Sequence, residues 1–99
     1  MKNDSFRDFV LDQLAELDVS ARSMFGAHGL YLGDKFFGII SRGRLYFKTN
    51  EKTRQGYIER GMGPFVASKK QILKNYYEVP PEIIENPNEL KSWAEEAAF

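Results

Sequence analysis

Residues 20–48 alternate short apolar runs with glycine-containing turns, and few folds are compatible with this pattern. Short apolar runs separated by turn residues are typical of β-strands. Four such runs lie near 21–25, 29–32, 35–41 and 44–48. Gly33-Asp34 and Arg42-Gly43 are the predicted hairpin turns, since glycine adopts the positive φ of tight turns at little cost. This part of the chain therefore predicts an antiparallel meander.

Helical patterns lie on both sides of the meander. A first helix is predicted because apolar residues recur at helical spacing at Phe6, Phe9, Val10, Leu14 and Leu17. After the meander, Thr49 or Asn50 is expected to cap a short helix that runs through Arg60 and ends at Gly61. The meander is thus expected to lie between two helices.

The C-terminal third adds two predicted strands and a last helix. The strands are expected near 65–68 and 73–79, with Lys69-Lys70 in the hairpin loop between them. Asn86 and Pro87 have the residue types that begin a helix. The apolar stripe of that helix consists of Leu90, Trp93, Ala94 and Ala97. Trp93 is interpreted as an anchor in the core.

This order of elements predicts an α+β fold of two layers. An antiparallel sheet of about five to six strands would carry its helices mainly on one face. The 99 residues suit a single domain over 1–99, because a chain of this length can bury one modest core.

The composition excludes several classes of functional site and indicates the cellular compartment. The chain has no cysteine, which excludes disulfides, thiolate zinc sites and cysteine nucleophiles. No stretch approaches the roughly 20 apolar residues of a membrane span, and the N-terminus lacks the apolar core of a signal peptide. We therefore expect a cytoplasmic protein with no cofactor and no membrane partner.

Charge is distributed unevenly along a chain whose formal net charge is zero. Residues 1–20 carry two basic and five acidic side chains, residues 21–76 carry eleven and three, and residues 77–99 carry one and six. Such asymmetry marks a surface for nucleic acid or an acidic partner, or a basic sheet neutralised by acidic helices. Both interpretations remain open at this point.

Strand alternation gives the predicted sheet a mixed basic and aromatic face. In "RLYFKT", Leu45 and Phe47 point to one face, whereas Arg44, Tyr46 and Lys48 point to the other. The candidate surface for a partner or nucleic acid consists of Arg22, Arg42, Arg44, Tyr46, Lys48, Lys69, Lys70, Lys74 and Tyr76.

No residue pattern indicates catalysis. His28 is the only histidine, and "FGAHGL" offers neither a nucleophile nor an orienting group at recognisable spacing. We interpret it as a turn or strand-edge histidine. "GAHG" lies between strand-like segments, so its glycines fit a tight bend or bulge better than a nucleotide-binding loop. We predict no catalytic, cofactor-binding or metal-binding residue.

Three stretches together resemble the N-terminal domain of the TfoX/Sxy family over about residues 6–98. They are "RSMFGAHGLYLGDKFFGIISRGRLYFKTN", the spaced "GPF" and "NYYEVPPEIIENPNELKSWAEEA". The resemblance implies a two-layer fold with an antiparallel sheet. It also implies a link to natural competence, since longer family members are positive regulators of DNA-uptake genes that act with the cyclic-AMP receptor protein. Those members carry a helical C-terminal domain, which this chain is expected to lack.

The resemblance supplies no catalytic or ligand residues, so three functions are weighed. The first is a non-enzymatic regulatory domain that contacts a protein partner, either transcription machinery or a second copy in a homodimer. The second is direct nucleic-acid binding, in which the basic residues meet phosphates and Tyr46 or Tyr76 stacks on bases. The third is a small-molecule pocket or hydrolytic site, which sequence alone does not reveal.

Overall fold

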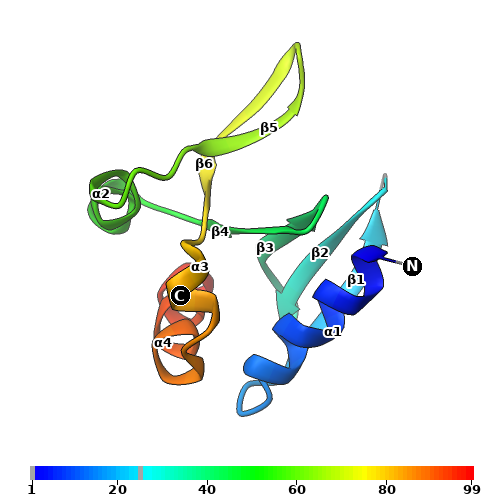
Figure 1. Ribbon diagram of the computed structural model, residues 1–99. Coiled ribbons are helices and arrows are strands. Elements are labelled where there is room, and N and C mark those ends of the chain that lie inside the picture. Colours follow the sequence, from blue (N-terminus) through cyan, green and yellow to red (C-terminus); the bar gives the residue numbers. More distant parts are fainter. Residues whose placement is uncertain (1, 25) are drawn as a thin grey trace.

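The computed structural model describes residues 2–24 and 26–99, which form a six-stranded antiparallel sheet and four helices (Figure 1). The strands are β1 (Val19–Met24), β2 (Ala27–Leu32), β3 (Lys35–Ser41), β4 (Arg44–Lys48), β5 (Pro64–Ser68) and β6 (Gln71–Glu78). The helices are α1 (Lys2–Gln13), α2 (Glu51–Glu59), α3 (Pro81–Ile84) and α4 (Pro87–Ala98). The strand order is β1-β2-β3-β4-β6-β5, and the predicted α+β fold is confirmed.

The predicted meander is present, with its turns at the expected glycines. Gly33 has a φ of 64°, and Arg42 and Gly43 have φ values of 54° and 75°. Two successive residues with positive φ are the mark of the type I′ hairpin turn, whose twist matches that of the flanking strands. The predicted first strand included Phe25, which lies outside the described residues.

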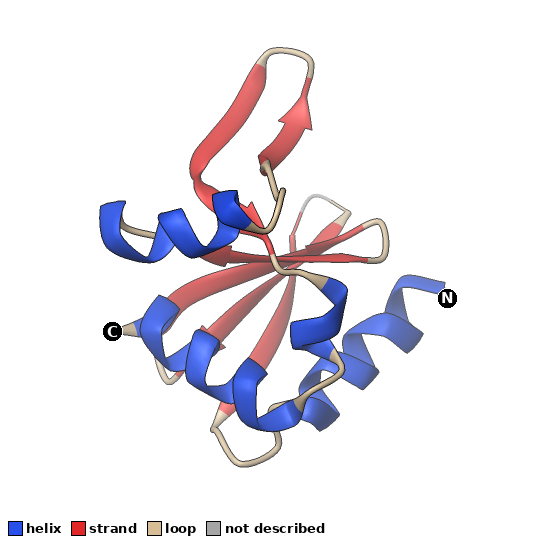
Figure 2. Cartoon of the chain, turned by 60° about the vertical axis from the view of Figure 1, so that its left-hand side comes forward, coloured by secondary structure: helices blue, strands red, loops and turns tan. Residues whose placement is uncertain are grey.

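The core lies between one face of the sheet and the helices, and it includes Tyr57 of α2 (Figure 2). Val10 of α1, Ile83 of α3 and Leu90 of α4 are fully buried against the sheet residues Leu45 and Phe47. Helices thus cover mainly one face, as predicted. None of the helices in the described part of the chain is long and apolar enough to cross a membrane.

Helix ends and the apolar stripes largely follow the sequence. Asn50 caps α2 with a capping box, in which its Oδ1 accepts from the Thr53 backbone N–H at 2.9 Å. Asn86 caps α4 and Pro87 occupies its first turn. Trp93 is partly buried against the core as predicted, whereas Phe9 is 43% exposed and does not belong to the buried stripe of α1.

The expectation for His28 is wrong in one respect. It is a buried residue of β2, between Ser23 of β1 and Ile40 of β3, and not a turn or edge residue. The reason is that β1 pairs along the whole of β2 and becomes the edge strand itself.

The two glycines around His28 serve different purposes. Gly26 has a φ of 80° and lies in the turn before β2, as expected of a tight bend. Gly29 lies inside β2, where an added Cβ would come within 3.1 Å of the Phe36 ring and 3.2 Å of the Met24 sulfur. The bulge itself lies in β3: Leu30 pairs with Gly38 and Tyr31 with Phe36, which leaves Phe37 as the extra residue.

Candidate functional site

On the face of the sheet opposite α1, α3 and α4, the β5–β6 hairpin bends away from the sheet and leaves a pocket. Phe65 pairs with Leu73, but the preceding residue Pro64 pairs with Tyr77, so residues 74–76 of β6 form a bulge. The Thr49 backbone N–H and hydroxyl donate to the Asn75 carbonyl at 2.6 and 2.9 Å, which anchors this irregularity. Because a bulge bends its strand, the hairpin leaves the plane of the sheet (Figure 1).

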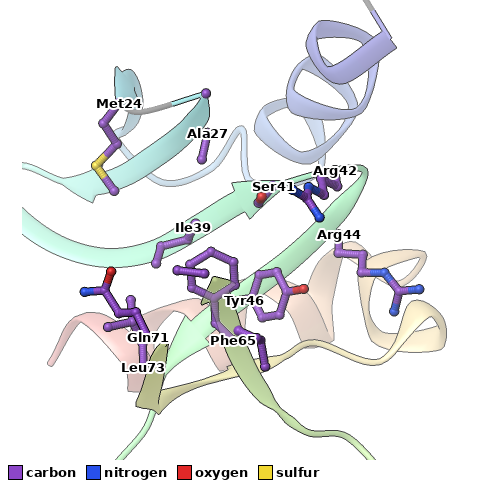
Figure 3. A pocket seen from close by; sticks show the side chains of 13 residues that line it. Met24, Ala27, Ile39, Ser41, Arg42, Arg44, Tyr46, Phe65, Gln71 and Leu73 are labelled. Atoms are coloured by element: carbon purple, nitrogen blue, oxygen red, sulfur yellow. The ribbon is translucent and has the colours of Figure 1, made fainter. Parts of the chain in front are cut away.

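A pocket of about 650 Å³ lies between the hairpin and the open face (Figure 3). Its apolar wall includes Met24, Ile39, Phe65 and Leu73, contributed by β1, β3, β5 and β6. Its polar lining residues are Ser41, Arg42, Arg44, Tyr46 and Gln71. Drug-sized ligands occupy pockets of this size, in which a few polar groups stand on mostly apolar walls.

Tyr46 stands in this pocket between aromatic and charged neighbours. Its ring centroid is 4.6 Å from that of Phe65. Burial raises the pKa of the Tyr46 hydroxyl, Glu78 raises it further, and Arg44 and Arg42 oppose the change. The hydroxyl therefore stays protonated at neutral pH and can donate a hydrogen bond.

The two arginines of the pocket differ in their partners. Arg44 Nη1 donates to Glu78 Oε1 at 3.1 Å and to Oε2 at 3.2 Å, so an adjacent carboxylate compensates its charge. Arg42 is exposed and forms no ion pair with any carboxylate in the described part of the chain. Positive charge at the pocket is therefore concentrated at Arg42.

Beside the pocket, aromatic and basic side chains form a row across the open face. We call this set the aromatic row; it consists of Arg22, Tyr31, Phe36, Tyr76 and Lys48. The Arg22 guanidinium carbon lies 4.7 Å from the Tyr31 ring centroid. The Tyr31 and Phe36 centroids are 5.3 Å apart, and those of Phe36 and Tyr76 are 5.6 Å apart. Lys48 pairs with Tyr76 in the β4–β6 register. The three rings are partly buried, while both cations are exposed.

The nine predicted surface residues thus fall into three places. Arg42, Arg44 and Tyr46 line the pocket, and Arg22, Lys48 and Tyr76 belong to the aromatic row. Lys69, Lys70 and Lys74 are exposed on the β5–β6 hairpin and do not line the pocket. The predicted alternation in β4 is confirmed, since Leu45 and Phe47 are buried on the helix side.

Sequence reasoning missed residues of both sites. Met24, Ile39, Phe65 and Leu73 were not expected to share a pocket, and Tyr31 and Phe36 were not placed on the open face. One signal was present in "FFGII": a continuous apolar run is typical of a strand that is covered on both faces. Ile39 is 1% exposed yet lies outside the helix-side core cluster.

The geometry gives no specific support for a role of His28 in the pocket or for a metal site among the described residues. His28 does not line the pocket, and its neighbour in the register, Ile40, belongs to the helix-side core. Among the residues that the structure describes, no three His, Asp or Glu side chains gather closely enough to hold a metal ion.

Comparison with known proteins identifies the family. The model of the TfoX N-terminal domain matches residues 12–98. The chain is 33% identical over 78 residues to the DNA transformation protein TfoX1 of Aliivibrio fischeri (strain ATCC 700601 / ES114). That alignment covers 77% of this chain and 37% of the relative, so the chain spans well under half of that protein's length. The resemblance inferred from the sequence motifs is therefore confirmed, and the chain belongs to the family of TfoX N-terminal domains.

Proposed function

We propose that this chain is a non-enzymatic regulatory domain of DNA transformation, which acts by binding a protein partner through the aromatic row. Its membership of the TfoX N-terminal domain family and its similarity to a DNA transformation protein support the process. The aromatic row supports the mode of action. The partner is a protein of the transcription machinery or a second copy of this chain.

The aromatic row has the residue composition of the core of a protein interface, and its side chains are held in fixed positions. Tyr, Phe and Arg are enriched at the cores of protein interfaces, and Tyr and Arg dominate their binding energy. The stacked rings of Tyr31, Phe36 and Tyr76 hold one another in place before a partner arrives. A partner that binds ordered side chains loses less conformational entropy, and affinity rises accordingly.

The competing proposal is direct binding of nucleic acid to the same face. Lys48 and Arg22 could meet phosphates while Tyr76 stacks on a base. The distribution of charge favours a protein instead, because Arg44 is paired with Glu78 and the aromatic row itself contains only two cations, Arg22 and Lys48. The two proposals differ in their dependence on salt.

The test reverses charge at the two ends of the aromatic row. Arg22→Glu and Lys48→Glu change exposed side chains, so the fold is expected to persist. Lys52→Glu, on an exposed position of α2, is the matched control. Each tagged protein is expressed in its native host, and co-purified proteins are quantified against the wild type. Transformation frequency is measured in the same strains.

We expect both row variants to recover at least about fivefold less of one stoichiometric partner, or of untagged chain, since interface centres lose more than about 1 kcal/mol on truncation. Transformation frequency should fall with them, and Lys52→Glu should match the wild type. Equal recovery by all four proteins, or repeated recovery of lone monomer, would contradict the proposal. Binding of a fluorescent DNA or RNA that weakens steeply with salt would favour the competing one.

A further inference from the structure

The pocket under the β5–β6 hairpin has an excess of positive charge, which membership of the TfoX N-terminal domain family does not explain. Its lining includes two arginines and no carboxylate. Glu78 compensates one of them from outside the lining, and Arg42 remains without an acidic partner among the described residues. A pocket of mixed apolar and polar walls with one uncompensated cation at its rim is complementary to an anion that carries an apolar body.

The backbone at Arg42 adds an independent observation. Its φ of 54° lies in the left-handed region, where glycine, asparagine and aspartate are the usual residues of a type I′ turn. An arginine there costs stability, and costs of this kind cluster at ligand-binding sites. The turn holds the Arg42 side chain at the rim of the pocket, beside Ser41 and Arg44 (Figure 3).

The remaining polar groups suit an anion as well. Hydroxyl donors are present at Ser41 and Tyr46, and Gln71 adds amide donors from the hairpin. The Tyr46 hydroxyl is a donor at neutral pH, and burial raises its pKa further above the ordinary tyrosine value. Met24, Ile39, Phe65 and Leu73 provide the apolar wall; Gln71 lies beside Leu73, and Tyr46 lies beside Phe65 (Figure 3).

We propose that this pocket binds a small organic anion, whose charged group meets Arg42 and whose apolar body packs among Ile39, Phe65 and Leu73. The anionic group is a carboxylate or a phosphate ester, both of which a guanidinium binds in the same bidentate manner. This site lies beside the aromatic row and does not depend on the partner proposed above. The chain therefore carries a ligand site in addition to its interaction surface.

The test is an NMR titration of the purified, isotope-labelled chain with four probes. The first two are 4-phenylbutyrate and phenylpropyl phosphate, which carry the two kinds of anion on one apolar body. The third is 4-phenylbutyramide, which has the body without the charge. Inorganic phosphate, the fourth, has the charge without the body. Arg42→Gln removes the charge of the rim, and Lys70→Gln makes the same change at an exposed hairpin residue outside the pocket.

We expect at least one organic anion to shift the amide signals of Ile39, Phe65 and Leu73 in a saturable way, with a dissociation constant of about 1 mM. Arg42→Gln should weaken that binding about tenfold and leave the amide probe unaffected, because only the charge-assisted hydrogen bonds are lost. The preferred anion identifies the charged group. Lys70→Gln should bind as the wild type does.

Four results would overturn the proposal. One is equal binding of the neutral amide and the organic anions, and another is no change on Arg42→Gln. The third is binding of inorganic phosphate as tightly as the organic probes. The fourth is a set of pocket signals that move with protein concentration alone, which would show that a second copy of the chain occupies the pocket.

Discussion

Replacing Arg42 by glycine should stabilise the protein, although it removes a large side chain. A non-glycine residue in the left-handed region costs about 1–2 kcal/mol, and the φ of 54° places Arg42 there. Glycine avoids this cost but gives the unfolded chain more freedom, which costs about 0.5–1 kcal/mol. The Arg42 side chain is exposed and forms no ion pair with described residues, so its loss costs little. The net expectation is a gain of about 0.5–1 kcal/mol.

Urea unfolding at neutral pH measures this gain directly. For a domain of this size it corresponds to a rise in Tm of about 2–8 °C. Arg42→Ala is the matched control, because alanine removes the same side chain and keeps the backbone cost; we expect it within about 0.5 kcal/mol of the wild type. If the glycine variant is no more stable than the alanine variant, the reasoning about backbone strain is wrong. Loss of anion binding together with a gain in stability would show why arginine occupies this turn.

Three further predictions concern the fold. Leu90→Ala should lower the free energy of unfolding by about 2–5 kcal/mol in urea denaturation, because Leu90 is fully buried between α4 and the sheet and alanine leaves a cavity; a loss below about 1 kcal/mol would contradict that packing. Asn50→Ala should cost about 0.5–2 kcal/mol through loss of the α2 capping box, whereas Asn88→Ala on the exposed surface of α4 should have little effect. Burial, with a smaller contribution from Glu96, raises the pKa of Tyr57. Above about pH 10 the unfolded chain therefore releases a proton that folded Tyr57 keeps, and stability falls by up to about 1.4 kcal/mol per pH unit. When the free energy of unfolding is compared at pH 9 and 11, it should fall less in Tyr57→Phe than in the wild type. An equal fall in the two proteins would show that Tyr57 ionises in the folded state as it does in the unfolded chain.

The meander and the helix ends were predictable because their signals are local. A glycine after a strand-like run defines a hairpin turn within two residues, as at Gly33 and Gly43. Asn50 and Asn86 each accept a hydrogen bond from a backbone N–H three residues ahead. Alternation in β4 placed Arg44, Tyr46 and Lys48 on one face for the same reason, since strand geometry fixes it residue by residue.

The pocket was not predictable in this way, because it depends on contacts between distant segments. The β5–β6 hairpin leaves the plane of the sheet at residues 74–76, where Thr49 binds the Asn75 carbonyl from 26 residues away in the chain. The segment "KNYY" contains no glycine or proline, and its single asparagine does not by itself predict a bulge. The same limit applies to the aromatic row, in which Phe36 and Tyr76 meet only after β6 has paired with β4.

The net charge of the middle segment, residues 21–76, does not describe the surface of the folded protein, because charged residues from other segments pair with its arginines. The eleven basic residues in 21–76 indicated either a surface for nucleic acid or an acidic partner, or a basic sheet neutralised by acidic helices. In the fold, Glu78 pairs with Arg44 and Glu82 with Arg60, both from the acidic C-terminal third. Arg54 instead donates to Thr49 and Asn75. Neither pair joins an acidic helix to the sheet, because Glu78 lies in β6 and Arg60 lies at the end of α2. Neutralisation of the sheet by acidic helices therefore stays a prediction, and Arg42 is the pocket arginine that forms no ion pair with a described carboxylate.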